Sequence, residues 1–361
     1  MLWRDIRLLN STYKKVDFFK RSRFYASEGQ RAARGKGRIR GPPMKFSLFK
    51  AVLTAAVATL VCCGCGGRSA VEDTVNLGGL LDESVPLTDA PAKGYFSVSS
   101  PGTASEKNRD AAIDYSNTAD GYVTAAWTGQ ADSRLKVLVN CPGGVTYQYN
   151  LRTDGEYEAF PLSDGDGTYT VGVYRNISGS EYAAILSASF PVTLTDEFAP
   201  FLRPNQYVNY RPDSAAAVRA SELCAGMEDN LKKVEAVYAF VVSNTVYDGE
   251  KAKTVTAGYL PDVDDTLRTG KGICFDYAAL MAAMLRTQGV PVKLVVGYTG
   301  EVYHAWLNVW SETSGWIEGG IFFDGKEWML MDPTFASGGN SSRSVMNYIS
   351  DESNYTAKFL Y

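Results

Sequence analysis

The stretch from Gly270 to Pro333 constrains the fold of this chain most, because one helical pattern is followed there by three strand patterns. Apolar residues recur at helical spacing after two glycines, and the pattern ends at Gly289 and Pro291. Three segments that are either rich in apolar residues or alternate between apolar and polar residues, as strands do, come next: 292–298, 304–310 and 328–332. We therefore expect a core in which this helix packs against a sheet.

Three reactive residues lie in this stretch. His304 is the only histidine of the 361-residue chain, Cys274 precedes it by 30 positions, and Asp332 follows it by 28. A free thiol has a pKa of ~8.5 and is only partly ionised at neutral pH, and a nearby imidazolium favours the thiolate. A carboxylate on the second ring nitrogen fixes the orientation and tautomer of the imidazole. This order is typical of a thiol nucleophile with its base and its orienting acid.

Cys274 falls in the first turn of the expected helix, where free backbone N–H groups favour a thiolate and bind an oxyanion. Asp276 lies in the same turn, and we interpret it as an acid that the helix dipole favours. Each residue of the trio also has a structural interpretation when taken alone. Cys274 would be a buried core residue, His304 a strand residue whose ring nitrogens are hydrogen-bonded, and Asp332 a residue that initiates a turn.

Four blocks in one order resemble the transglutaminase-like superfamily of thiol enzymes. They are Gly-Lys-Gly-Ile-Cys-Phe-Asp-Tyr-Ala, Gly-Val-Pro-Val-Lys-Leu-Val-Val-Gly-Tyr, His-Ala-Trp-Leu-Asn-Val and Met-Asp-Pro-Thr-Phe, within residues 231–335. The resemblance implies a papain-like α+β core with Cys274 as nucleophile, His304 as general base and acid, and Asp332 as orienting carboxylate. It also implies an oxyanion-stabilising side chain upstream of the cysteine. Tyr247 is our candidate, and a core tyrosine is the alternative at that position.

Two classes of function remain open. The first is a cysteine peptidase, amidase or acyltransferase that acts on an amide or peptide bond through an acyl-thioester on Cys274. We prefer hydrolysis to transfer because the sequence has no visible lysine-acceptor site. The second class is a non-catalytic surface binding or scaffold protein with the same fold, which the intact trio disfavours. The expected substrate is a peptide or protein, including cell-wall peptide; no cofactor is expected, and without a CxxC pair or histidine cluster no metal site is expected.

The N-terminal 65 residues differ in charge from the rest of the chain. Residues 1–43 hold 12 Lys and Arg against 3 Asp and Glu, a net charge of +9, whereas the remaining residues have a net charge of −13. After Met44, two lysines precede an apolar run of 11 residues at 51–61, and small residues and cysteines follow. This is the layout of a secretory signal, and the run is shorter than the ~20 residues of a membrane-spanning helix.

Residues 44–65 resemble a bacterial lipoprotein signal, which implies acylation of a cysteine that becomes the new N-terminus. Cys65 follows a glycine and is the preferred lipid site, and Cys63 is the alternative. We therefore expect a lipid-anchored protein on the extracellular face of a bacterial cell membrane. We expect translation to start at Met44, and a basic cytoplasmic tail before an uncleaved anchor is the alternative. A cut before Cys65 leaves a net charge of −15, which disfavours nucleic acid as a partner.

The remaining chain divides into three predicted parts. Residues 66–94 are polar and acidic, as in a flexible linker. Residues 95–195 contain short alternating runs separated by turn signals, which predict an all-β sandwich of immunoglobulin-like type. Residues 196–361 form the transglutaminase-like domain, with helical residues at 213–244 and a tail that returns over the core. Cys141 and Cys224 are expected in different domains, so we predict no structural disulfide.

Overall fold

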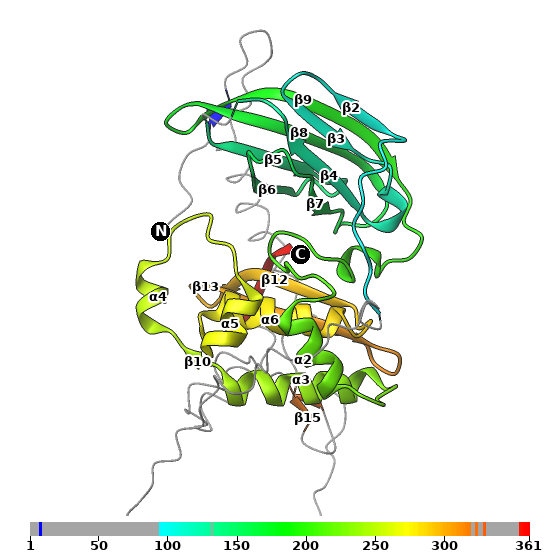
Figure 1. Cartoon of the computed structure of the whole chain (residues 1–361), viewed down its shortest axis with the longest axis vertical. Helices are drawn as coiled ribbons and strands as arrows, with labels where there is room; N and C mark the ends of the chain where they lie inside the picture. Colours follow the sequence, from blue (N-terminus) through cyan, green and yellow to red (C-terminus); the bar gives the residue numbers. More distant parts are fainter. Residues whose placement is uncertain (1–6, 9–93, 131–132, 319–321, 324–327, 330–353) are drawn as a thin grey trace, which may run out of the picture. The chain divides into compact units, whose positions relative to one another are not determined.

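The computed structural model describes residues 7–8, 94–130, 133–318, 322–323, 328–329 and 354–361. All of them belong to one of the two compact units of the chain. They comprise a two-sheet region followed by a core of helices and strands (Figure 1). The predicted signal at 44–65, the linker up to residue 93 and the lipid-site candidates Cys63 and Cys65 lie outside the described residues, as does the basic prefix apart from Arg7–Leu8.

The two-sheet region contains two sheets with the strand orders β1-β9-β8-β5-β6 and β2-β3-β4-β7. Neighbouring strands are antiparallel, except that β1 runs parallel to β9. The elements are β1 Arg7–Leu8, β2 Ser105–Lys107, β3 Ala111–Asp114, the 3-10 helix η2 Thr118–Asp120, β4 Tyr122–Trp127, β5 Leu135–Asn140, β6 Thr146–Leu151, β7 Glu158–Pro161, β8 Gly167–Ser178 and β9 Glu181–Val192.

Apolar side chains of both sheets fill the space between them. Val123, Ala125 and Trp127, which alternate along β4, are buried in one hydrophobic cluster with residues of β5 and β8. Tyr149 of β6 and Phe160 of β7 lie in different sheets, and their rings meet in a T-shaped contact with centroids 4.9 Å apart. This region is all-β as expected from its alternation, and its immunoglobulin-like class stays a prediction.

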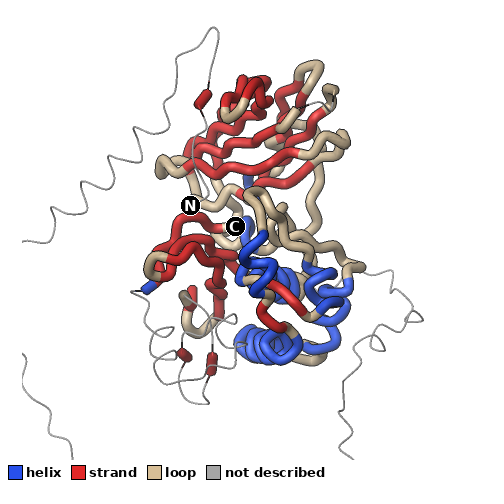
Figure 2. The backbone as a smooth tube through the Cα atoms, turned by 90° about the vertical axis from the view of Figure 1, so that its left-hand side faces the viewer, coloured by secondary structure: helices blue, strands red, loops and turns tan. Residues whose placement is uncertain are grey.

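The second half of the chain forms one larger sheet with helices beside it (Figure 2). The strand order of this antiparallel sheet is β14-β13-β12-β17. The helices are the 3-10 helix η3 Ala199–Phe201, α2 Ala215–Leu223, α3 Asn230–Asn244, α4 Gly249–Thr254, α5 Val263–Thr269 and α6 Cys274–Arg286. The strands are β10 Val246–Tyr247, β11 Lys271–Gly272, β12 Val292–Thr299, β13 Val302–Ser311, β14 Gly315–Ile317, β15 Phe322–Phe323, β16 Trp328–Met329 and β17 Tyr355–Leu360.

The central element of this core is α6, which contacts α2, α3, α5, β12 and β13. Every residue from Asp276 to Arg286 is buried, because a helix with neighbours on all sides has no solvent face. The helical residues predicted at 213–244 form two helices instead of a continuous one. The Ser214 side chain caps α2 by accepting a hydrogen bond from the Ala217 N–H. α3 has a separate N-cap, Asp229.

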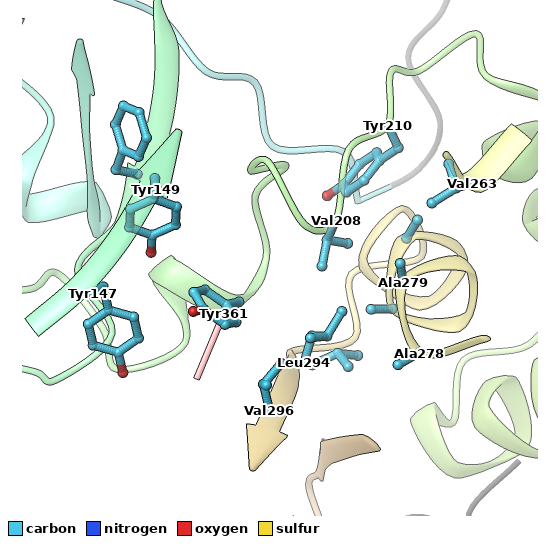
Figure 3. Packing of buried hydrophobic residues seen from close by; sticks show 14 of the residues in the cluster. Tyr147, Tyr149, Val208, Tyr210, Val263, Ala278, Ala279, Leu294, Val296 and Tyr361 are labelled. Atoms are coloured by element: carbon cyan, nitrogen blue, oxygen red, sulfur yellow. The ribbon is translucent and has the colours of Figure 1, made fainter. Parts of the chain in front are cut away.

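The chain end returns over the core, as predicted, and pairs antiparallel with β12 as β17. Tyr361 is buried, and its ring contacts those of Tyr147, Tyr149 and Tyr207. Figure 3 shows Tyr361 with Tyr147 and Tyr149. The Leu360 N–H also donates to the Tyr147 hydroxyl over 3.3 Å. The last residues therefore connect the sheet that carries β13 to strand β6 of the two-sheet region.

Candidate active site

Cys274 is the first residue of α6 and is partly exposed. In an α-helix the first N–H groups have no intrahelical acceptor, so the backbone at this position is suited to stabilise a negative charge. The other described cysteines, Cys141 and Cys224, are buried, and burial raises the pKa of both thiols. Among the described cysteines, the one that a solute can reach therefore lies at a helix N-terminus.

His304 lies on β13, the strand that packs against α6, and is 6% exposed. Its ring is nearly parallel to that of Trp306, with centroids 6.3 Å apart. The register partner of His304 on β12 is Gly297, where a side-chain Cβ would collide with the carbonyl oxygen of Thr356 on β17. The strand that carries the imidazole therefore packs against the helix that begins with the thiol, and its neighbour β12 has a glycine where β17 approaches closely.

Asp332 lies outside the described residues, so its role as orienting acid stays a prediction. The dipeptide Asp324-Gly325, which favours a hairpin turn, lies outside them as well. The strands on either side of that dipeptide, β15 and β16, pair antiparallel, with Phe323 opposite Trp328. The described part of the predicted strand 328–332 is therefore limited to Trp328 and Met329.

Tyr247, the oxyanion candidate, is 40% exposed and lies on the short strand β10. This strand runs parallel to β11, and the register places Tyr247 beside Gly272, two residues before the thiol. Backbone hydrogen bonds of 2.8 Å on both sides hold this register, from the Val246 N–H to the Gly270 carbonyl and from the Asp248 N–H to the Gly272 carbonyl. Tyr247 is therefore a partly exposed neighbour of the segment that leads into α6, not a core tyrosine.

Asp276 makes contacts that the helix-dipole interpretation did not anticipate. Its fully buried carboxylate accepts the Ile273 N–H at 2.8 Å and the Tyr259 hydroxyl at 2.5 Å, and it pairs with the Lys251 ammonium at 2.8 Å. Lys251 lies on α4 and Tyr259 on the connection to α5. Sequence analysis missed both residues, because their spacing from Asp276 matches no motif and only the acid itself stood out.

Two tyrosines of the β12–β13 hairpin contact each other, close to His304 in the sequence. Tyr303 precedes His304 and is 48% exposed, and its ring meets that of Tyr298 in a T-shaped contact at 5.5 Å. Burial raises the pKa of Tyr303 to about 12, with smaller contributions from Tyr298 and Cys274. Tyr303 and Cys274 are therefore close enough to interact electrostatically.

No group of three or more His, Cys, Asp or Glu side chains that could hold a metal ion occurs among the described residues. In the same part of the chain, no helix has the length and apolar character needed to cross a membrane.

Comparison with known proteins gives a match to one segment of the chain. Residues 218–333 match the model of the transglutaminase-like superfamily. A protein-glutamine gamma-glutamyltransferase of Pseudomonas aeruginosa is 36% identical over 70 residues, which cover 15% of this chain and 10% of that protein. The chain therefore spans about a tenth of the length of this curated relative.

Three solved structures have low overall similarity to this one. A candidate cysteine protease from Cytophaga hutchinsonii has a TM-score of 0.33 and 15% identity, covering 64% of this chain and 72% of its own. A candidate protease from Parabacteroides distasonis has a TM-score of 0.26 and 11% identity over 58% and 64% of the two chains. Red sea bream transglutaminase has a TM-score of 0.26 and 13% identity over 63% and 53%.

The family match begins within α2 and ends after β16, and it includes the segments that carry all three predicted catalytic positions. The chain thus contains a segment, residues 218–333, that matches the transglutaminase-like superfamily.

Proposed function

We propose that this protein is a thiol enzyme that acts on amide or peptide bonds through an acyl-thioester on Cys274. The observation that carries this proposal is the position of Cys274. It is a partly exposed thiol at the N-terminus of α6, and α6 packs against the strand that carries the only histidine of the chain. The resemblance of residues 218–333 to a superfamily of thiol enzymes supports it.

In the proposed reaction, the Cys274 thiolate attacks the carbonyl carbon of the scissile bond and a tetrahedral oxyanion forms. The N–H groups of the first turn of α6 and the hydroxyl of Tyr247 stabilise that oxyanion. The intermediate collapses, the carbon–nitrogen bond breaks, and the leaving amine takes a proton from the His304 imidazolium. His304 then removes a proton from water, whose attack on the thioester releases the acid and the thiolate. Asp332 orients the imidazole throughout.

Hydrolysis and transfer differ only in the second nucleophile. Water gives a peptidase or amidase, and an amine gives an acyltransferase. We favour hydrolysis, because the sequence offers no lysine-acceptor site. The curated relative from Pseudomonas aeruginosa bears the name of a glutamyl transferase, and transfer to an amine is accordingly the outcome that the assay must be able to detect.

The proposal also includes a location. The signal-like residues 44–65 support export and acylation of Cys65, with Cys63 as the alternative. Residues 95–195 would then form an immunoglobulin-like module between the anchor and the catalytic domain. Peptides, host or dietary protein and cell-wall stem peptides are the substrates that an enzyme at such a location would meet.

The experiment is a screen of peptide and cell-wall substrates with the native chain and with Cys274→Ala. Mass spectrometry detects both the free acid and, when a primary amine is added, the transfer product. The proposal expects at least one substrate to be converted by the native chain and not by Cys274→Ala. Conversion that persists in the variant would contradict a thioester on Cys274. Binding of a substrate without conversion by either protein would favour the scaffold class.

A further inference from the structure

The negative charge of the buried Asp276 disfavours ionisation of the Cys274 thiol. Asp276 lies two residues after Cys274, at the third position of α6, and is fully buried. A carboxylate there stabilises the helix start, since it accepts the Ile273 N–H and complements the helix dipole. The same negative charge opposes a thiolate in the same turn, and it does so more strongly in a buried environment than in water.

The cation that pairs with the Asp276 carboxylate belongs to a different helix. Lys251 of α4 places its ammonium 2.8 Å from the Asp276 carboxylate and 4.6 Å from the centroid of the Tyr259 ring. The Tyr259 hydroxyl donates to the second carboxylate oxygen. Burial and the adjacent Asp276 raise the pKa of Tyr259 to about 12, so the hydroxyl keeps its proton at neutral pH. The carboxylate thus has three donors, and one of them carries a full positive charge.

The geometry around the carboxylate leaves little freedom. A Cβ on Gly272 would come within 2.6 Å of the Asp276 Cβ, so the carboxylate side chain packs directly on the segment before the thiol. The same segment pairs with β10, which carries Tyr247. The Tyr277 hydroxyl donates to the Thr245 carbonyl over 2.7 Å and ties α6 to the start of β10. The contacts of Asp276 therefore fix the segment between the oxyanion candidate and the nucleophile.

We propose that Lys251 and Tyr259 are positioning residues of the thiol site: they fix and neutralise Asp276, so that this carboxylate holds the start of α6 without opposing the Cys274 thiolate. Neither residue needs to touch the substrate. The assignment of a catalytic role to this turn rests on the proposed function. The electrostatic effect on the thiol is measurable in the absence of any substrate.

Other titratable groups lie on elements around this end of α6. Tyr303 and His304 are on β13, Lys271 is on β11 and Tyr247 is on β10, while on α5 the acidic and basic side chains of Asp265 and Arg268 pair with each other. All of these groups stay unchanged in the variants described below. Differences between the variants then report on Lys251 and Asp276.

The test compares the rate of alkylation of Cys274 by iodoacetamide against pH in Lys251→Met, Asp276→Asn and the double variant. The labelled peptide is identified by mass spectrometry, with Cys274→Ala as the blank. Lys253→Met is the matched control, because this lysine of the same helix is exposed and pairs with the exposed Glu250. Melting temperatures confirm that each protein is folded at the assay temperature.

We expect Lys251→Met to move the pH–rate curve upward by about one pH unit, which slows labelling at neutral pH ~10-fold, because the buried carboxylate has lost its cation. The double variant removes both charges and should recover to within ~3-fold of the native rate, and Lys253→Met should match the native protein. A purely structural role predicts instead that the double variant is as slow as Lys251→Met or slower.

Two results would overturn the inference: a native-like curve for Lys251→Met, or a double variant that does not recover. Failure of the proposed function gives a different signature. In that case the native Cys274 alkylates with the pH dependence of an ordinary free thiol, whereas the order of the variants still decides the role of Lys251.

Discussion

The two-sheet region and the helical core each bury a carboxylate, and each contains a cysteine, but the surroundings of these residues differ. Asp114 of β3 is buried and accepts the backbone N–H groups of Gly102 and Ser116, at 2.6 Å and 2.9 Å. Asp276 of α6 is buried and also accepts one backbone N–H, but it faces an ammonium and a phenol as well. The first carboxylate organises a turn, and the second organises a helix start that carries a thiol.

The cysteines make the same contrast. Cys141 follows β5, is buried, and has a pKa that burial and the nearby Asp164 raise. Cys274 is partly exposed at a helix N-terminus, on the helix that packs against the strand of His304. One chain therefore contains an inert thiol as an internal reference for the proposed nucleophile. Substitutions in the core should impair the site, and a substitution in the two-sheet region should leave the site unchanged.

The largest effect is expected from His304→Ala. Loss of the only imidazole removes both the base and the acid, so turnover of a substrate found by the screen should fall by ~10⁴-fold. The melting temperature should change by only a few degrees, because one strand side chain is shortened. Turnover is compared by mass spectrometry, and a variant that retains more than a small fraction of activity would contradict the thiol–imidazole mechanism.

Asp332→Asn should have the next largest effect. The substitution keeps the shape of the side chain but removes the charge that stabilises the imidazolium, so turnover should fall by ~10³-fold or more with little change in stability. A turn former before Pro333 would tolerate asparagine almost as well. Unchanged labelling of Cys274 together with unchanged stability would remove Asp332 from the site.

Trp127→Ala tests whether the thiol site depends on the two-sheet region. Trp127 is 1% exposed in the two-sheet region, and its truncation should lower the free energy of unfolding by ~3–5 kcal/mol. Denaturant unfolding measures that change. Below the unfolding transition the alkylation rate of Cys274 should equal that of the native chain, because no contact of the thiol is altered. A large change in that rate in folded protein would show that the two regions are coupled at the site.

Cys224→Ala should have the smallest effect. Cys224 is 5% exposed at the end of α2, and burial raises its pKa, so it contributes packing and no reactive thiolate. We expect a loss of ~1 kcal/mol or less in unfolding free energy and unchanged turnover. Activity assays and denaturant unfolding on the same preparation check both statements. A variant with native stability and lost turnover would instead place Cys224 in the site.

Local patterns predicted the core elements well, for physical reasons. The glycine-flanked apolar run gave α6, and the alternation around His304 gave β13, because burial imposes those periods on the sequence. The alternation of apolar and other residues at 304–310 also predicted that only one face of this strand would be buried. The structure buries His304, Trp306 and Asn308 as well as Ala305 and Leu307, so side chains on both faces of β13 are covered.

Contacts between distant segments were beyond sequence analysis. Lys251 and Tyr259 reach Asp276 only because α4 and the following connection pack against the start of α6, and nothing in their own neighbourhood marks them. The fully buried Arg286 is a second example. It donates to the carbonyls of Val292, Arg203 and Tyr361, and the two most distant of these are brought to it by the tertiary fold.

The most direct test of the central claim is the alkylation rate of Cys274 at pH 6 relative to pH 8, in the native chain and in His304→Ala. The thiolate fraction of an ordinary thiol falls ~100-fold over that interval, and its alkylation rate falls with it. An imidazolium-paired thiolate at a helix N-terminus should lose less than ~10-fold, and His304→Ala should restore the steep dependence. A native chain as steep as the variant would contradict the account.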